Sequence, residues 1–184
     1  MQMTVTYSRF TDAVATQAAK SMRAKVEALQ DELLKMPQAD VKFVHEFEPG
    51  KYIRTIIAPP WSVIVGAEHK TPYKIVLKKG TVAVNIDDKI RTLTAPFEFD
   101  APAGVKRVAR VFDEELIWVD IYDNPDDCND VETIEERIYV IPECGLLSNP
   151  KALERRKQQL NQELPTNNVK MLLNNGFGFS DKGI

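Results

Sequence analysis

The sequence is poor in the residues on which many metal sites and cross-links depend. Its 184 residues include two cysteines, two histidines and two tryptophans. Cys128 and Cys144 stand outside any metal-spaced motif, so we expect free thiols in a reducing compartment, with a disulfide between them as the alternative. No apolar run approaches the roughly 20 residues that cross a bilayer. The first residues also lack the basic and then apolar regions of a secretory signal.

Several motifs of known chemistry are missing as well. The chain has no nucleophile elbow, no phosphate-binding glycine loop, no paired cysteines and no aromatic and basic surface typical of single-strand binders. A net charge of −3 gives no general reason to expect nucleic acid or an anionic membrane as a partner. The hydrophobic fraction of 43% and the charged fraction of 28% are ordinary for a soluble globular protein.

A long helix is predicted near the start, because residues 9–36 contain neither glycine nor proline. Apolar residues recur every three or four positions and form one stripe: Phe10, Val14, Ala18, Met22, Val26, Leu29, Leu33 and Met36. Such a helix is roughly 42 Å long, and Pro37 ends it. Two interpretations stay open. Either the stripe packs across the chain's own barrel, or part of it contacts a neighbouring subunit.

The pattern changes to period two from Val41 to Tyr122, which predicts strands. We expect about nine: Val41–Glu48, Lys51–Ala58, Ser62–Val65, Tyr73–Lys78, Thr81–Ile86, Lys89–Leu93, Phe97–Asp100, Val105–Phe112 and Leu116–Tyr122. A polar turn is expected to present Glu68, His69 and Lys70. A run of short strands without intervening helices is typical of a sandwich or barrel.

The C-terminal third is expected to extend the barrel. Val131–Ile141 predicts a short helix or loop followed by an added strand. A second helix is predicted over 149–164, and the tail after it carries apolar residues that we expect to bind another surface, its own or a partner's. The predicted division is 1–37 for the arm and long helix, 38–125 for the barrel and 126–184 for the extension. The predicted oligomer contacts are Phe10, Val14, Met22, Leu29, Leu33, Phe177 and Phe179.

The stretch from Trp61 to Gly80 resembles the cupin (RmlC-like jelly-roll) pattern. Gly66, His69 and Gly80 match the first cupin motif, and Pro102-Ala-Gly104 matches the turn of the second. The resemblance covers roughly Ile53 to Asp123. It implies a mainly β fold, a cupin-like antiparallel β-barrel with a long N-terminal helix and a C-terminal helical extension.

Departures from that pattern bear on metal binding. Thr71 stands where the resemblance implies a second histidine, and Arg107 stands where the second motif has its histidine. Arginine is a permanent cation that repels a metal ion. His69 is left, with Glu68 beside it, and one imidazole does not hold a catalytic metal. We therefore predict neither a metal nor another cofactor.

The candidate site residues have alternative interpretations. His69 is either a structural polar residue at the barrel mouth or an acid/base with Tyr73 as its partner. Arg107 either satisfies the barrel interior, paired with Glu98, Glu68 or Asp100, or joins Lys70 and Lys74 in an anion pocket. If His69, Tyr73 and Arg107 converge on one open cavity, the functional interpretation is favoured, whereas a Trp or Phe that plugs the cavity would exclude it.

A closer resemblance is to small cupin-like proteins of tailed bacteriophages. It is carried by Trp61, Val63-Ile-Val-Gly66, His69-Lys70-Thr71, Ala95-Pro96-Phe97, Pro102-Ala-Gly104-x-x-Arg107 and Trp118. The resemblance implies a phage origin, in the virion or the host cytoplasm, with other virion proteins as partners and no membrane partner.

Two main functional hypotheses follow. The first is a non-enzymatic phage structural or virion-assembly protein that forms a homo-oligomer through its helical and tail extensions. The second is a metal-independent cupin-type enzyme, or a protein that binds an anionic ligand such as a nucleotide or sugar phosphate at the barrel mouth. A phage factor that sequesters a host signalling nucleotide would need the same pocket.

Overall fold

The computed structural model describes residues 22–141. The predicted contacts Phe10, Val14, Phe177 and Phe179, the predicted helix 149–164 and Cys144 lie outside the described residues. Residues 22–33 are helical. The other elements are β1 (Lys42–Glu48), β2 (Lys51–Ala58), β3 (Val63–Val65), β4 (Glu68–His69), β5 (Tyr73–Lys79), β6 (Thr81–Ile86), β7 (Lys89–Thr94), β8 (Phe97–Ala101), β9 (Val108–Val111), β10 (Leu116–Asp123), α2 (Val131–Ile138) and β11 (Tyr139–Val140).

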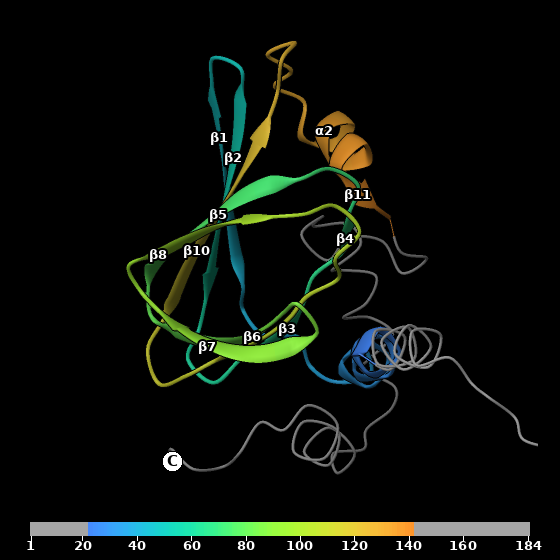
Figure 1. Ribbon diagram of the computed structural model, residues 1–184, viewed down its shortest axis with the longest axis vertical. Helices are drawn as coiled ribbons and strands as arrows, with labels where there is room; N and C mark the ends of the chain where they lie inside the picture. The colour runs from blue at the N-terminus through green and yellow to red at the C-terminus, as the bar shows by residue number, and fades with distance from the viewer. Residues whose placement is uncertain (1–21, 142–184) are drawn as a thin grey trace, which may run out of the picture.

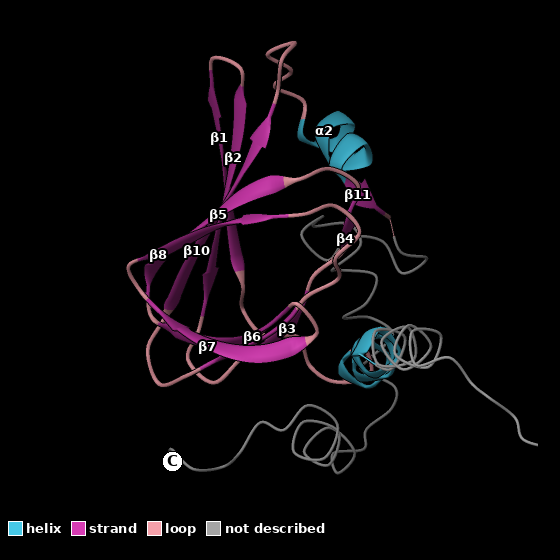
Figure 2. Cartoon of the chain, in the orientation of Figure 1, coloured by secondary structure: helices cyan, strands magenta, loops and turns pink. Residues whose placement is uncertain are grey.

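Two antiparallel sheets enclose the core (Figures 1 and 2). One has the strand order β1-β2-β10-β5-β8, and the other has the order β3-β9-β6-β7. A third, two-stranded sheet pairs β11 with β4. Since β10 lies between β2 and β5 although it comes last of the three in sequence, the chain folds by crossovers between the sheets rather than as a simple meander. The predicted mainly β fold is confirmed.

Tight turns fix the strand register. Asp87 and Asp88 form the two-residue link between β6 and β7, with φ of 50° and 57°. Positive φ at both central residues is the geometry of a type I′ hairpin turn, which matches the twist of the strands it joins. Gly80, at φ 89°, links β5 to β6 against the backbone of Glu115. The sequence signals of these turns therefore give the strand ends correctly.

Two expected elements differ from the structure. The predicted strand Val105–Phe112 is shorter, since β9 begins at Val108. The side chain of Asn85 explains this, because its Oδ1 accepts from the Val108 N–H (2.7 Å) and its Nδ2 donates to the Lys106 carbonyl (3.1 Å). The expected polar turn at His69 is instead the short strand β4, whose partner β11 lies 70 positions along the chain.

The helix 22–33 covers the outer face of the β3-β9-β6-β7 sheet (Figure 1). Val26 and Leu29 are buried together with Ala83 and Val108, and Met22 and Leu33 pack against them. The strand period of two sends the alternate residues of the same sheet, such as Val82 and Val84, into the main core. In the described part, the stripe therefore packs on the chain's own barrel. Contacts with a second subunit stay a prediction.

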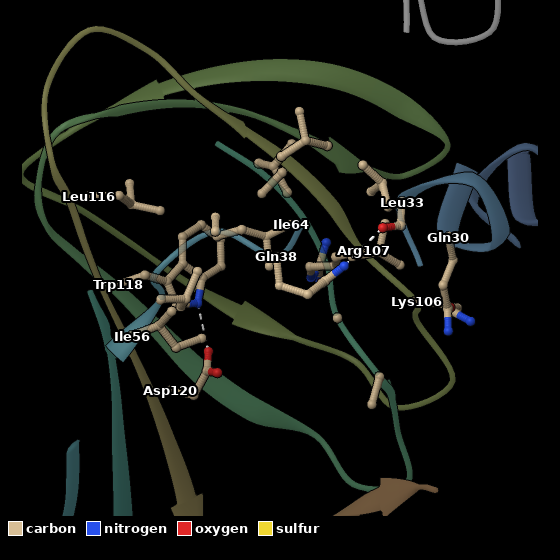
Figure 3. A pocket seen from close by; sticks show the side chains of 18 of the residues that line it. Gln30, Leu33, Gln38, Ile56, Ile64, Lys106, Arg107, Leu116, Trp118 and Asp120 are labelled. Atoms are coloured by element: carbon tan, nitrogen blue, oxygen red, sulfur yellow. Dashed lines mark hydrogen bonds between the residues drawn. The ribbon is translucent and has the colours of Figure 1, made fainter. Parts of the chain in front are cut away.

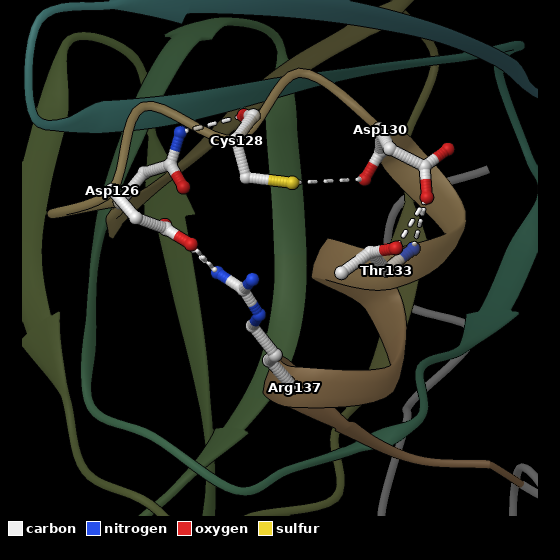
Figure 4. Close-up of polar contacts among 6 residues, drawn as sticks. Asp126, Cys128, Asp130, Thr133 and Arg137 are labelled. Carbon is white, nitrogen blue, oxygen red and sulfur yellow. Dashed lines mark hydrogen bonds and ion pairs between the residues drawn. The ribbon is translucent and has the colours of Figure 1, made fainter.

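The helix α2 lies next to β11 (Figure 1), and Figure 4 shows its polar contacts. Its N-cap is Asp130, whose carboxylate accepts from the Thr133 N–H at 3.0 Å. Arg137 in its last turn donates to Asp126 at 2.8 Å. Its buried face joins the main core through Ile134, Ile138 and the following Tyr139. The expected short helix and added strand over 131–141 are thus confirmed, and no helix in residues 22–141 is long and apolar enough to cross a membrane.

Candidate active site in the barrel cavity

Cross-strand pairing arranges the inner face of the five-stranded sheet in rows. One row runs from β1 to β8 through residues that are register partners of their neighbours: His45, Arg54, Asp120, Ile75 and Phe99. The row on one side of it is aromatic and contains Phe47, Tyr52 and Tyr122. The row on the other side is apolar and contains Phe43, Ile56, Trp118, Leu77 and Phe97. Because facing residues on antiparallel strands have side chains on the same side of the sheet, Arg54 and Asp120 lie next to each other inside the barrel.

Asp120 is 3% exposed, and a neighbouring residue of its own strand, Trp118, hydrogen-bonds its carboxyl group. Its Oδ1 accepts from the indole N–H of Trp118 at 2.7 Å (Figure 3). Burial raises the pKa of Asp120 to about 6, against the opposing effects of the Arg54 charge and the Trp118 hydrogen bond. None of the ion pairs within residues 22–141 joins Asp120 to Arg54, so the Arg54 charge acts on the carboxyl group without a direct contact.

A hydrogen-bonded chain of hydroxyl groups lies beside this pair. Arg54 Nη1 donates to the Tyr139 hydroxyl, which shares a 3.0 Å hydrogen bond with the Tyr122 hydroxyl. The Tyr122 hydroxyl in turn lies 3.0 Å from His69 Nε2. Burial raises the pKa values of Tyr122 and Tyr139, so both phenols stay protonated. The chain therefore joins the Arg54 guanidinium to the His69 imidazole through neutral hydroxyl groups.

The imidazole of His69 is buried and neutral. Burial lowers the pKa of His69 to about 3, and the positive charges of Arg54 and Arg107 act in the same direction. Its ring stacks on Tyr73 with centroids 4.0 Å apart. The Tyr73 ring lies 5.2 Å from the Tyr122 ring, which continues the stack along the aromatic row. This environment suits a structural imidazole better than a proton acceptor.

Arg107 comes from the loop before β9 and approaches the same space from the other sheet. Its Nη1 donates to the Asn85 carbonyl at 2.7 Å, and its Nε donates to the Tyr73 hydroxyl at 3.4 Å. Its guanidinium carbon lies 5.5 Å from the ring centroid of Phe99. Arg54 belongs to β2 of the five-stranded sheet, whereas Arg107 precedes β9 of the other sheet. The two guanidinium groups therefore enter the barrel from opposite sheets.

A cavity of about 650 Å³ is lined by Arg54, His69, Tyr73, Arg107 and Asp120 (Figure 3). Much of its wall is apolar and comes from Ile56, Ile64, Val84, Ala109, Leu116 and Trp118. Pro37 and Ala39, which are exposed, also line it, so the cavity reaches the surface beside the loop that follows the helix. The Gln38 amide lies there and donates to the Leu33 and Met36 carbonyls at 2.9 and 2.8 Å.

The structure brings together three of the five predicted site residues. His69, Tyr73 and Arg107 line the cavity. Lys70 and Lys74 do not line it. The Lys70 ammonium donates to the Glu136 carbonyl at 2.8 Å, and the Lys74 ammonium pairs with Glu98 at 3.0 Å on the exposed side of the sheet. Trp118 forms part of the cavity wall, with its N–H on Asp120, and leaves the 650 Å³ cavity beside it.

Sequence reasoning missed Arg54, Asp120 and the roles of Tyr122 and Tyr139. One signal was present, since Arg54 and Asp120 occupy inward positions of otherwise apolar alternations, Tyr52-x-Arg54-x-Ile56 and Trp118-x-Asp120-x-Tyr122. A charged residue at an inward position of a strand is uncommon without a function or a partner. The pairing of β2 with β10, which makes the two residues neighbours, is not visible in the sequence.

The donors present do not fit the metal that a cupin barrel implies. His69 Nε2 is engaged with Tyr122, and the Arg107 charge acts on His69. Within residues 22–141, no group of three His, Cys, Asp or Glu side chains could hold a metal ion.

Among solved structures, cupin domains are similar to this chain. One, from an XRE-family transcriptional regulator of Enterobacter cloacae, is 18% identical with a TM-score of 0.41 and covers 48% of this chain and 99% of that domain. A cupin domain from Bordetella pertussis is 18% identical with a TM-score of 0.40, covering 48% and 98%. KdgF from a Halomonas species is 17% identical with a TM-score of 0.39, covering 49% and 79%.

No protein-family model and no curated protein matches the chain. The fold assignment rests on the strand pairing described above, and the bacteriophage origin stays a prediction.

Proposed function

We propose that this protein binds a small organic carboxylate with an apolar body inside the barrel cavity. The observation that carries the proposal is the pair of arginines, Arg54 and Arg107, that line one largely apolar cavity from opposite sheets. Guanidinium groups bind carboxylates through paired N–H donors. Apolar walls with a few polar groups are typical of small-molecule sites, and 650 Å³ lies within the usual range of their volumes.

Both guanidinium groups keep donors for a ligand. Arg107 uses Nε and Nη1 in the contacts with Tyr73 and Asn85, and Arg54 uses Nη1 on Tyr139. Arg54 Nε is buried and has no hydrogen-bond partner within residues 22–141. The hydrogen bonds that the two arginines make there use Arg54 Nη1 and Arg107 Nε and Nη1, which leaves both Nη2 groups for a ligand. A bound carboxylate would supply acceptors for these groups. A hydrogen bond between a guanidinium group and a carboxylate is stronger in a cavity than in water, because the local dielectric constant is lower.

The charge of the cavity also favours an anion. Four basic and two acidic side chains line it: Arg23, Arg54, Lys106, Arg107, Glu68 and Asp120. Arg23 and Glu68 neutralise each other in an ion pair of 2.5 Å. Since Lys70 and Lys74 lie outside, we favour a singly charged carboxylate over the nucleotide or sugar phosphate that the sequence suggested.

Bacteriophage assembly through homo-oligomers remains a separate hypothesis. Its predicted contacts before residue 22 and after residue 141 lie outside the described residues. Of the others, Leu29 is buried against the chain's own sheet, and Met22 and Leu33 pack beside it. The convergence of His69, Tyr73 and Arg107 on one cavity is the observation that favours the ligand-binding function instead.

Thermal unfolding with matched ligands tests the proposal. The probes are carboxylates of increasing size, from acetate to 4-methylpentanoate, each beside its neutral amide. We expect at least one acid, and not its amide, to raise the melting temperature, as a ligand at 100 times its Kd stabilises a protein by about 2.7 kcal/mol. Arg107→Gln should weaken binding of that acid at least tenfold, whereas Arg91→Gln, an exposed control, should not. Equal effects of acids and amides, or no effect of any acid, would contradict the proposal.

A further inference from the structure

We propose that Asp120 takes a proton from the carbon next to the carbonyl of a bound 2-oxo carboxylate, so that the cavity interconverts its keto and enol forms. The inference rests on the proposed binding function and adds a reaction to it. It starts from the row in which Asp120 lies between Arg54 and the apolar Ile75, facing the cavity.

The arrangement supplies the parts that proton abstraction needs. Asp120 is oriented by the Trp118 indole, and none of the ion pairs within residues 22–141 includes its carboxylate. Arg107 approaches from the opposite sheet and would hold the carboxylate of the substrate. Arg54, the register partner of Asp120, would place its remaining N–H groups on the carbonyl oxygen. A base and an oxyanion donor therefore lie side by side on neighbouring strands.

The step balances without a cofactor or a second reactant. The C3–H bond breaks, the proton moves to the Asp120 carboxylate, and the bonding electrons form a C2=C3 double bond. The electron pair of the carbonyl moves onto its oxygen, where Arg54 stabilises the negative charge. Asp120 then returns the proton to that oxygen, which gives the enol, or to C3, which restores the keto acid.

Other titratable groups in or beside the cavity are less suited to act as the base. His69 shares its Nε2 with the Tyr122 hydroxyl, and its low pKa makes it a weak base. Tyr73 and Tyr122 have raised pKa values, so they stay protonated. Glu68 is paired with Arg23. Asp120, whose burial raises its pKa, is a stronger base than an ordinary aspartate and is ionised at neutral pH.

Proton exchange in deuterium oxide tests the inference, with 4-methyl-2-oxopentanoate as the probe. Loss of the C3 proton signals is followed by NMR at neutral pH, with and without protein, and binding of the probe is measured separately. We expect the wild type to accelerate exchange. Asp120→Asn should reduce the protein-dependent rate at least about 100-fold, the lower range for a general base, while the probe still binds. Asp100 is an exposed carboxylate on β8, and Asp100→Asn should accelerate exchange of the probe as much as the wild type does.

The outcomes separate this inference from the proposed function. If the probe binds and the wild type does not accelerate exchange, proton abstraction is wrong and carboxylate binding stands. If Asp120→Asn loses binding together with exchange, Asp120 is part of the binding site only, and the inference is again wrong. If neither the probe nor any acid of the panel binds, the proposed function itself fails. Because the wild type alone decides the first point, that outcome does not depend on how the variant folds.

Discussion

Stability between pH 6.0 and 4.5 should reveal the two buried titratable groups, because they act with opposite signs. The pKa of His69 falls from 6.5 to about 3 on folding. Unfolded chains therefore bind a proton that folded chains do not, and the contribution of His69 is lost as the pH falls below 6.5. The pKa of Asp120 rises from 3.8 to about 6. Its contribution is full below 3.8 and is lost as the pH rises through 6.

The magnitudes predict a cancellation in the wild type. A difference of one bound proton changes the free energy of unfolding by about 1.4 kcal/mol per pH unit. Over 1.5 pH units, His69 should destabilise the protein on acidification by about 2 kcal/mol, and Asp120 should stabilise it by about 2 kcal/mol. Asp120→Asn removes one of the two opposing slopes. Its stability should therefore fall by about 2 kcal/mol more than that of the wild type over this range.

Urea unfolding at four pH values between 6.0 and 4.5 measures the effect. Only differences between variants are compared, because the exposed carboxylates contribute equally to all of them. His69→Gln should show the opposite deviation. Between pH 6.0 and 4.5, its free energy of unfolding relative to that of the wild type should rise by about 2 kcal/mol. Asp100→Asn, whose carboxylate is exposed, should follow the wild type. If Asp120→Asn and the wild type give parallel profiles, Asp120 is not protonated near pH 6 in the folded state, and its assignment as a raised, buried acid is wrong.

Two further predictions concern the frame of the barrel. Leu29→Ala should cost about 3 kcal/mol in urea unfolding, because this side chain is fully buried between the helix and the sheet, whereas exposed Lys25→Ala should change little. A cost below 1 kcal/mol would mean that the helix is not docked. Gly80→Ala should destabilise at least twice as much as Gly50→Ala, which should cost about 1 kcal/mol. Both have positive φ, but an added Cβ lies 2.8 Å from the Glu115 carbonyl at Gly80 and meets nothing within 4 Å at Gly50. Equal costs at the two glycines would show that the Glu115 backbone gives way.

Local signals were sufficient for most of the fold. The Pro49-Gly50 pair and the Asp87-Asp88 pair mark hairpin turns, and strand periodicity between them places β1, β2, β6 and β7 within one residue of their observed bounds. The strand β4 was missed for a physical reason, because two residues have no periodicity of their own. Its pairing with β11, far along the chain, makes it a strand. Turn chemistry is local, whereas pairing between distant strands is decided by tertiary structure.

The candidate site was only partly predictable for the same reason. The cupin resemblance singled out His69, Tyr73 and Arg107, which do line the cavity. The resemblance gave no weight to Arg54 and Asp120, because these residues become neighbours only when β2 and β10 pair. Lys70 and Lys74 had the right charge for an anion pocket, but they do not line the cavity. Lys70 donates to the Glu136 carbonyl, and Lys74 pairs with Glu98. Residue type therefore indicated the kind of site, but whether a side chain faces the cavity was decided by the tertiary structure.

The row through Arg54 and Asp120 is the part of the barrel that packing alone does not explain. Transfer of a guanidinium and a carboxylate from water to the interior carries a desolvation cost, and well-packed apolar residues in such positions are often equally or more stabilising. Here the two groups do not offset that cost by a direct ion pair, since none of the ion pairs within residues 22–141 joins them. The rows on either side show that this sheet accommodates aromatic and aliphatic residues at equivalent positions. The charged pair Arg54 and Asp120 faces a cavity and lies between two uncharged rows. Since stability does not require this pair, its presence supports the proposed ligand, which would complete the hydrogen bonds of the guanidinium group.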